Sequence, residues 1–154
     1  MAVVLICVVV VVISLATILW KKRSEYQRSL MEQHAIAPEE LFSLLGSHQD
    51  VALFDVRQPL DLLAHSEIIP GARRIPPADV MASPSLIPQD KEAIVYCTCR
   101  GDKTSREILR RALDLHFSKI KFLKGGLEAW KAKGYTVEPY REVFHLYTPN
   151  LVRH

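Results

Sequence analysis

Residues 93–105 read A-I-V-Y-C-T-C-R-G-D-K-T-S, and this stretch decides the fold of the chain. The apolar, β-branched run at 93–96 is typical of a buried strand, and it leads into two cysteines, Cys97 and Cys99. From Thr104 onward the apolar residues recur with the period of a helix, which we expect over residues 104–115. The stretch therefore predicts a strand, a short loop that carries both cysteines, and a helix.

The loop between this strand and this helix has residue types that can hold a reactive sulfur. Backbone N–H groups of a short loop and of a helix N-terminus stabilise a thiolate. Arg100 and Lys103 add positive charge that would attract an anion, whereas the carboxylate of Asp102 opposes it. Either Thr104 or Ser105 can cap the helix. The candidate substrate-binding residues are Arg100, Gly101, Asp102, Lys103, Thr104 and Ser105.

Three other interpretations of the two cysteines stay open at this point. A cysteine at the end of a strand is commonly a small apolar core residue. A zinc site would need further Cys or His ligands at a fitting spacing, and a C-x-C pair alone supplies too few. A redox-active dithiol is a third interpretation, although its usual spacing is C-x-x-C.

Shorter signals on both sides of this stretch complete an α/β pattern. Residues 51–56 and 120–123 are expected as buried strands, and a turn at 70–72 leads into a short strand that stops at Pro76 and Pro77. Helices are expected from residue 38 onward, at 60–65 and at 127–133. Strands that alternate with helices predict a mainly parallel sheet covered on both faces.

The N-terminal segment differs from the rest of the chain because no charged residue precedes Lys21. As a helix, residues 2–20 would span roughly 28 Å, close to the thickness of a bilayer core of about 30 Å. A cleaved signal peptide is disfavoured, since no basic segment precedes the apolar run and no small-residue cleavage site follows it. We therefore expect a transmembrane anchor with its basic flank at 1–23 and a juxtamembrane stalk at 24–33.

The basic cluster Lys21-Lys22-Arg23 lies on the C-terminal side of this segment. By the positive-inside rule, the N-terminus of a single-pass protein would lie outside and the following domain in the cytoplasm. A bacterial inner membrane is the expected location. A reducing compartment agrees with closely spaced cysteines that form no disulfide.

Composition excludes several other classes of protein. A chain of 154 residues suits one ordinary domain. Its 20 Lys and Arg against 17 Asp and Glu give a net charge of +3, too mild for a nucleic-acid-binding surface, so no nucleic-acid partner is expected. Three cysteines cannot build a disulfide framework, and 49% hydrophobic residues exclude a disordered chain.

Five short pieces in fixed order give the chain a resemblance to a known family. Residues 35–135 resemble the rhodanese-like (sulfurtransferase) family in the pieces P-E-E-L at 38–41, F-D-V-R at 54–57, I-P-G-A at 69–72, I-V-Y-C at 94–97 and G-G-L-E-A-W at 125–130. The resemblance implies a three-layer α/β fold over residues 34–138, with a parallel five-stranded sheet between helices. The remaining residues, 139–154, would form a C-terminal tail.

The same resemblance implies a sulfurtransferase that works through a cysteine persulfide. The donor would be thiosulfate or a persulfide, the acceptor a thiol or cyanide, and the partner a small anionic sulfur donor or a persulfide-carrying protein. Neither a metal nor an organic cofactor is expected. The alternatives are a non-catalytic rhodanese-like binding module and, with less support, a phosphatase or arsenate reductase. That last chemistry needs an arginine six positions after the cysteine, where Lys103 or Ser105 stands here.

The family pattern favours Cys99 over Cys97 as the nucleophile by a small margin. Cys99 has the family's loop length to Ser105, whereas Cys97 has the family's strand phrase but would need a longer loop. Cys97 could instead be the nucleophile, with Cys99 as its resolving partner. Asp55 and Arg57 are supporting residues with two interpretations: Arg57 attracts anions beside the loop, or the pair ties the end of the sheet to nearby backbone, which we favour.

Overall fold

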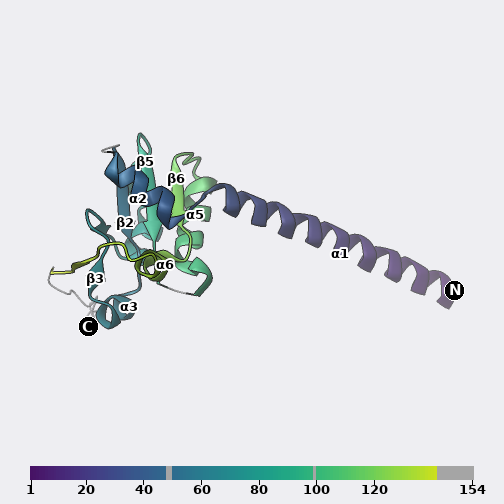
Figure 1. Ribbon diagram of the computed structural model, residues 1–154. Coiled ribbons are helices and arrows are strands. Elements are labelled where there is room, and N and C mark those ends of the chain that lie inside the picture. The colour runs from purple at the N-terminus through teal and green to yellow at the C-terminus, as the bar shows by residue number, and fades with distance from the viewer. Residues whose placement is uncertain (48–49, 99, 142–154) are drawn as a thin grey trace, which may run out of the picture. The chain divides into compact units, whose positions relative to one another are not determined.

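The computed structural model describes residues 1–47, 50–98 and 100–141, with the side chains of residues 2–6, 8 and 100 left out (Figure 1). The chain separates into two compact units, Met1–Ala35 and Ile36–His154. The first unit is essentially one helix, α1, which runs over Ala2–Gln33. Two hydroxyls in its apolar part bond to helix backbone: Ser14 Oγ donates to the carbonyl of Val10 and Thr17 Oγ1 to that of Ser14, both at 2.8 Å.

No helix in the described part of the chain is both long enough and apolar enough to cross a membrane. This finding does not support the transmembrane helix expected at residues 2–20.

The second unit is built on a five-stranded sheet, with strands in the order β1-β6-β5-β2-β4. Figure 1 labels three of these strands, β2, β5 and β6. The pairings of β5 with β6, β5 with β2 and β2 with β4 are parallel, as the α/β pattern predicted. The strands are β1 (Ala35–Ile36), β2 (Val51–Asp55), β4 (Arg73–Arg74), β5 (Glu92–Tyr96) and β6 (Ile120–Leu123).

Helices connect the strands, and three of them begin at a proline. Pro38, Pro59 and Pro77 stand at the first helical positions of α2, α3 and α4, where the fixed φ suits a helix and the missing N–H costs nothing. Pro77 was expected to end a strand, but it starts a helix that the sequence pattern did not reveal. The helices are α2 (Pro38–Gly46), α3 (Pro59–Ala64), α4 (Pro77–Ala82), α5 (Lys103–Asp114) and α6 (Gly126–Ala132), with short 3₁₀ turns η1 (Pro84–Leu86) and η2 (Arg100–Asp102).

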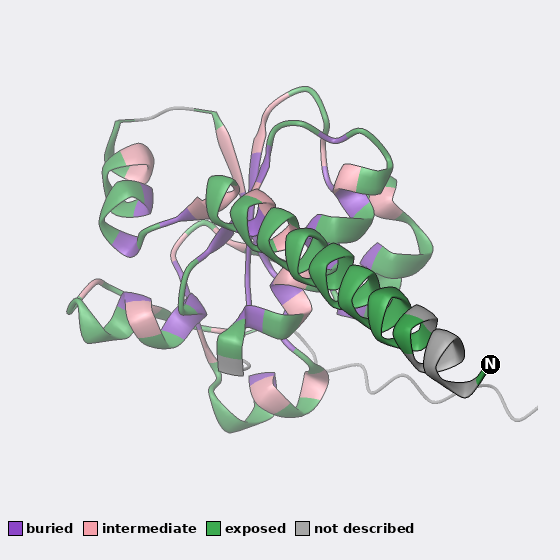
Figure 2. Ribbon diagram, turned by 90° about the vertical axis from the view of Figure 1, so that its right-hand side faces the viewer, coloured by how far each residue is buried: buried purple, intermediate pink, exposed green. Residues whose placement is uncertain are grey.

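The core has two halves, one on each face of the sheet. On one face, Leu41 of α2 and Trp130 of α6 belong to the same buried cluster as Ile94 and Tyr96 of β5. Ala93 and Val95 of β5 alternate with those residues and are also fully buried, which places them on the opposite face. α4 and α5 contact each other, and α5 contacts β6. Figure 2 shows the buried residues concentrated along the central strands, and the three-layer α/β fold is therefore confirmed.

A second, two-stranded sheet was not expected. β3 (Glu67–Ile68) pairs antiparallel with β7 (Glu138–Pro139), and the N–H of Tyr140 donates to the carbonyl of Ser66 at 2.8 Å. The domain boundary expected at residue 138 therefore falls inside β7, because backbone pairing continues past it. The rest of the expected tail, residues 142–154, lies outside the described residues.

Candidate active site

The cysteine loop lies at the edge of the sheet where the parallel strands end. Because β2, β4, β5 and β6 are parallel neighbours, the segments that follow them meet at one edge. Ligands of open α/β sheets bind at this carboxyl edge. The cysteine loop follows β5, residues 56–58 follow β2, residues 75–77 follow β4 and residues 124–126 follow β6.

Cys97 is a buried thiol with 1% of its surface exposed. Its carbonyl accepts the N–H of Leu127 at 3.1 Å. Gly126 lies so close that a Cβ there would stand 1.7 Å from the Cys97 oxygen, so only glycine fits the approach of the two backbones. These contacts make Cys97 part of the packed junction between β5 and α6. The other candidate, Cys99, lies outside the described residues.

The helix after the loop starts earlier than the sequence suggested. α5 begins at Lys103, so the expectation that Thr104 or Ser105 caps it is wrong, since both lie inside its first turn. Gly101 and Asp102 have φ values of 67° and 56°, a left-handed pair that turns the chain into the helix. Both residue types tolerate this region, glycine because it lacks a Cβ and aspartate because its short side chain can bond locally.

Asp102 stands at the N-cap position of α5, but its side chain does not cap that helix. Its Oδ2 accepts the N–H of Gly125 at 2.9 Å, and the residue is only 5% exposed. Burial raises the pKa of Asp102, while the bond from Gly125 and the charges of Arg106 and Lys124 act in the opposite direction. The sequence suggested a carboxylate that opposes anion binding. In the structure this carboxylate instead accepts a hydrogen bond from the backbone that follows β6.

Ser105, in the first turn of α5, has a buried hydroxyl that lacks a hydrogen-bond partner in the described part of the chain. Its side chain is fully buried, and Oγ has no hydrogen-bond partner among the described residues. The first N–H groups of a helix also lack partners within the helix. Because a buried unmatched hydroxyl costs free energy, this combination favours a ligand with hydrogen-bond acceptors at the start of α5.

The other residues of the loop are more accessible. Lys103 and Gly101 are exposed, and Thr104 is half-buried. Arg100 lies in the 3₁₀ turn before α5. Arg106, which sequence reasoning did not single out, places its guanidinium 5.0 Å from the ring centre of Phe122 on β6.

Asp55 and Arg57 form a fully buried pair beneath the same edge. Asp55 accepts Nη2 of Arg57 at 2.5 Å and Nε at 2.8 Å. The Arg57 guanidinium also donates to the carbonyls of His65 and Glu67, each at 2.7 Å. These bonds tie the end of β2 to the backbone at residues 65 and 67, which is the kind of contact that the structural interpretation describes.

Tyr96 joins this pair to β5, the strand that leads into the cysteine loop. Its hydroxyl accepts the N–H of Ile69 at 3.1 Å and bonds Asp55. Burial raises the pKa of Tyr96 well above its ordinary value, and the charge of Asp55 adds to the effect. The tyrosine therefore stays neutral and serves as a structural link between β5, β2 and the segment at Ile69.

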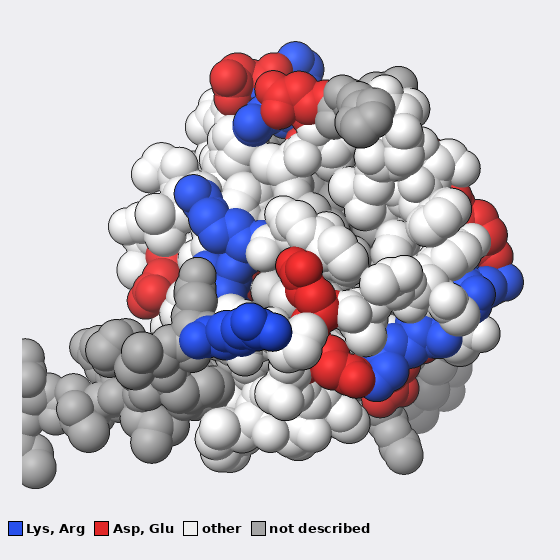
Figure 3. All heavy atoms as spheres, turned by 60° about the vertical axis from the view of Figure 1, so that its left-hand side comes forward, with Lys and Arg blue, Asp and Glu red and all other residues white. Residues whose placement is uncertain are grey.

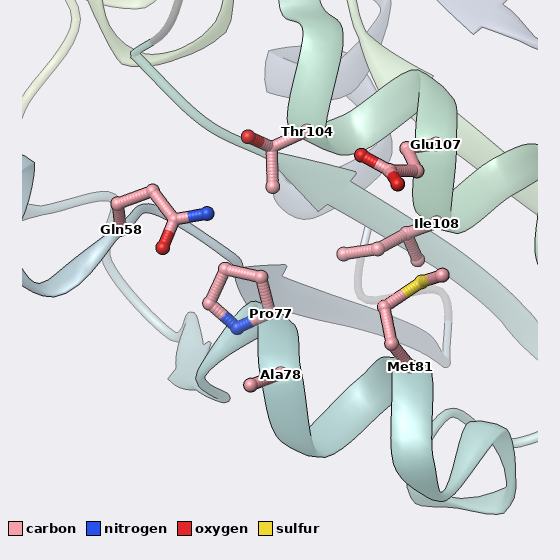
Figure 4. A pocket seen from close by; sticks show the side chains of 7 residues that line it. All are labelled: Gln58, Pro77, Ala78, Met81, Thr104, Glu107 and Ile108. Carbon is pink, nitrogen blue, oxygen red and sulfur yellow. The ribbon is translucent and has the colours of Figure 1, made fainter. Parts of the chain in front are cut away.

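Two hollows adjoin the start of α5 and differ in charge. Figure 4 shows the first, of about 230 Å³, where Gln58 faces α4 and α5 and the carboxylate of Glu107 turns toward Thr104. Its lining includes no basic residue: Gln58, Pro77, Ala78, Met81, Thr104, Glu107 and Ile108. The second, of about 390 Å³, is lined by Gly101, Lys103, Arg106, Glu107 and Arg110. Glu107 therefore borders both, and the second hollow supplies the cations that an anion would need.

Charge elsewhere is mixed. On the face in Figure 3, basic side chains form small groups separated by acidic and uncharged ones. No cluster of three or more His, Cys, Asp or Glu in the described ranges could hold a metal ion.

Sequence reasoning missed the residues that hold the loop in place. In the sequence, Gly125 stood out only as part of the piece G-G-L-E-A-W at 125–130, and its bond to Asp102 spans 23 positions. The closely spaced glycines at 125 and 126 were the one available signal, because adjacent glycines indicate that backbone or side chains approach closely.

Comparison with known proteins agrees with the fold. The model of the rhodanese-like domain family matches residues 37–133. The probable adenylyltransferase/sulfurtransferase MoeZ of Mycobacterium tuberculosis is 36% identical over 98 residues, 62% of this chain and 24% of that protein. The chain thus spans about a quarter of the length of that relative.

A sulfurtransferase of Allochromatium vinosum is 28% identical over 99 residues, 64% of this chain and 89% of that protein. Among solved structures, a thiosulfate sulfurtransferase of Pseudomonas aeruginosa has a TM-score of 0.59 at 24% identity, covering 71% of this chain and 21% of its own. That structure supports the fold. Since the family model covers most of the chain, the protein belongs to the rhodanese-like domain family.

Proposed function

We propose that the domain is a sulfurtransferase whose nucleophile is Cys99. The observation that carries this proposal is the buried, unmatched hydroxyl of Ser105 in the first turn of a helix that Asp102 leaves uncapped. Both features supply hydrogen bonds for an anionic sulfur. The 1% exposure of Cys97 argues against it as the residue that meets a substrate. Relatives named sulfurtransferases add support from the family.

The chemistry would proceed in two balanced steps. The Cys99 thiolate attacks the outer sulfur of thiosulfate, a new S–S bond forms, and the old S–S bond breaks with its electron pair leaving on sulfite. A persulfide donor reacts in the same way and leaves as a thiolate. The enzyme persulfide then gives its outer sulfur to cyanide or a thiol, and the Cys99 thiolate is restored. Covalent catalysis of this kind needs an activated thiolate and no external oxidant.

An anionic donor would approach from the basic hollow. Lys103, Arg106 and Arg110 line it, and one carboxylate, Glu107, partly offsets their charge. The lysine attracts an oxyanion as a point charge but lacks the bidentate fork of an arginine. We therefore place sulfur transfer ahead of phosphate or arsenate chemistry, in which a fork must grip the oxyanion.

The test is intact mass spectrometry after treatment with thiosulfate, followed by addition of cyanide. Wild-type protein should gain the mass of one sulfur atom and release thiocyanate. Cys99→Ser should do neither, and Cys97→Ser should still form the adduct. Absence of an adduct in the wild type, or an adduct that survives in Cys99→Ser, contradicts the proposed mechanism.

We also propose that residues 2–20 anchor the domain in a bacterial inner membrane, with residues 21–23 on the cytoplasmic side. The support is the sequence itself, in which the first charged residue is Lys21. After expression in a bacterium, the full-length chain should stay with the membrane fraction in alkaline carbonate, whereas a variant without residues 2–20 should not. Release of the full-length chain by carbonate would contradict the anchor.

A further inference from the structure

The two ends of the cysteine loop, at Cys97 and Asp102, both bond to one turn in the connection between β6 and α6. At the near end, the carbonyl of Cys97 accepts the N–H of Leu127 at 3.1 Å. At the far end, Oδ2 of Asp102 accepts the N–H of Gly125 at 2.9 Å. The donors are two residues apart between β6 and α6, while the acceptors bracket the segment 98–101. A short piece of backbone, residues 125–127, therefore bonds to both ends of the loop.

This turn has little room to move. Gly125 and Gly126 have φ values of 74° and 54°, in the left-handed region. A Cβ on Gly125 would stand 2.6 Å from Cβ of Ala129, and one on Gly126 would stand 1.7 Å from the oxygen of Cys97. Such close packing makes the turn a fixed reference for the groups bound to it.

We propose that Asp102 is a positioning residue, whose carboxylate fastens the far end of the cysteine loop to Gly125 and so keeps the N-terminus of α5 open to a ligand. An aspartate at an N-cap ordinarily bonds the first N–H groups of its own helix. Asp102 binds another segment instead, and its left-handed backbone carries the chain from the loop into α5. The inference rests on the proposed function in taking Cys99 as the reacting residue.

A rival role for Asp102 is purely electrostatic. A carboxylate near the loop would destabilise a thiolate, as the sequence alone suggested. The two roles make opposite predictions for variants that lose the charge. If Asp102 only repels the thiolate, every such variant makes Cys99 more reactive. If Asp102 positions the loop, only a variant that keeps the bond to Gly125 stays reactive.

Two substitutions separate these roles. Asp102→Asn removes the charge but keeps an acceptor oxygen for Gly125, and asparagine also tolerates a left-handed backbone. Asp102→Gly removes both the charge and the acceptor, while glycine adopts the backbone conformation at no steric cost. Asp114→Asn is the matched charge control, because it removes one exposed carboxylate at the other end of α5.

The measurement is the rate of alkylation by iodoacetamide as a function of pH, on the full-length chain in mild detergent. Peptide mass spectrometry assigns the reaction to Cys99 rather than to Cys97 or Cys7. In Asp102→Gly the apparent pKa of Cys99 should rise toward the ordinary value of about 8.5, and its alkylation near neutral pH should slow about tenfold. Asp102→Asn and Asp114→Asn should stay within about threefold of the wild type.

Equal rates for Asp102→Asn and Asp102→Gly, or faster reaction in both, would overturn the inference. Thermal unfolding shows whether Asp102→Gly remains folded. If it does not, hydrogen exchange at the Gly125 amide decides: the wild type and Asp102→Asn should both protect it, and rapid exchange in the wild type rejects the bond. Alkylation needs no sulfur transfer, so failure to form a persulfide would refute the proposed function without deciding the role of Asp102.

Discussion

Asp55 and Asp102 are two buried carboxylates at the same edge of the sheet, and the protein holds them in different ways. Asp55 lies at the end of β2 and faces the guanidinium of Arg57, whose charge balances its own. Asp102 lies at the end of the cysteine loop, and the bond it receives comes from a neutral peptide N–H, that of Gly125. Burial accordingly raises the pKa of Asp102.

The difference indicates that the Asp55–Arg57 pair is part of the framework of the fold, whereas Asp102 acts on the cysteine loop alone. A buried pair with matched charges and further bonds to His65 and Glu67 ties β2 to the backbone around β3. A carboxylate held by one hydrogen bond from a peptide N–H can position a loop, and its removal breaks no buried ion pair among the described residues. Substitution at Asp55 should therefore damage the fold, whereas substitution at Asp102 should act mainly on the loop.

The largest effect is expected from Asp55→Ala. It leaves the guanidinium of Arg57 buried without its counter-charge, and breaking such a pair costs about 3–5 kcal/mol. Urea denaturation followed by circular dichroism measures the free energy of unfolding. Asp50→Ala is the matched control, because its ion pair with Lys91 is exposed.

The double variant Asp55→Asn, Arg57→Met sharpens this prediction. It removes both charges and should recover part of the stability lost in Asp55→Ala, since no isolated charge remains buried. A loss in Asp55→Ala no larger than that in Asp50→Ala would show that the pair is not part of the framework.

Gly126→Ala should have the second largest effect. The added Cβ would meet the oxygen of Cys97 at 1.7 Å and would stand on a backbone with φ of 54°. Overpacking and left-handed strain together should cost about 3 kcal/mol. Gly134→Ala isolates the strain, because Gly134 has φ of 74° and nothing within 4 Å of its would-be Cβ.

The control should lose only about 1 kcal/mol. The same denaturation experiment compares the two variants. Equal losses in the free energy of unfolding would mean that the backbone at Cys97 moves aside for the added Cβ at little cost. The turn at 125–127 could then not serve as a fixed reference.

Much of the framework was predictable because its signals are local. The spacing of Asp55 and Arg57, the apolar run at 93–96 and the periodicity of α5 each lie within a few residues, and the structure confirms a strand or helix at each run. The sequence pattern at Pro77, the first residue of α4, was misleading because proline both ends strands and begins helices. β3 and β7 were missed because each is two residues long and their pairing joins residues 67–68 to 138–139.

The geometry of the site was less predictable because its partners are distant in sequence. Cys97 and Leu127, Asp102 and Gly125, and Tyr96 and Ile69 meet only when the sheet forms. The residue types in the loop indicated a reactive sulfur, but they could not show that the carboxylate of Asp102 accepts a hydrogen bond from Gly125. Nor could they show that Ser105 is buried inside α5 rather than at its cap.

A smaller effect is expected in the pH dependence of stability at Asp102. Because burial raises its pKa in the folded state, the folded protein binds a proton more tightly there than the unfolded chain does. The resulting stabilisation is present below the ordinary pKa of an aspartate and is lost as pH rises through the raised value. Asp102→Asn cannot titrate, so its free energy of unfolding relative to the wild type should increase over that window. A constant difference between the two from acid to neutral pH would contradict this account.

The smallest effect is expected from a third carboxylate, Glu107, which should influence the approach of an anionic ligand rather than the stability of the fold. Glu107 is exposed, borders both hollows and has no hydrogen bond or ion pair with any described residue. Glu107→Gln should leave the free energy of unfolding unchanged but raise kcat/KM for thiosulfate about threefold, because one screened repulsion is removed. Asp114→Asn removes the same charge about two turns further along α5 and should change the rate less. The gain should shrink as salt is added. An equal gain in both variants would mean that the net charge of the helix, rather than the position of Glu107, governs the approach of the anion.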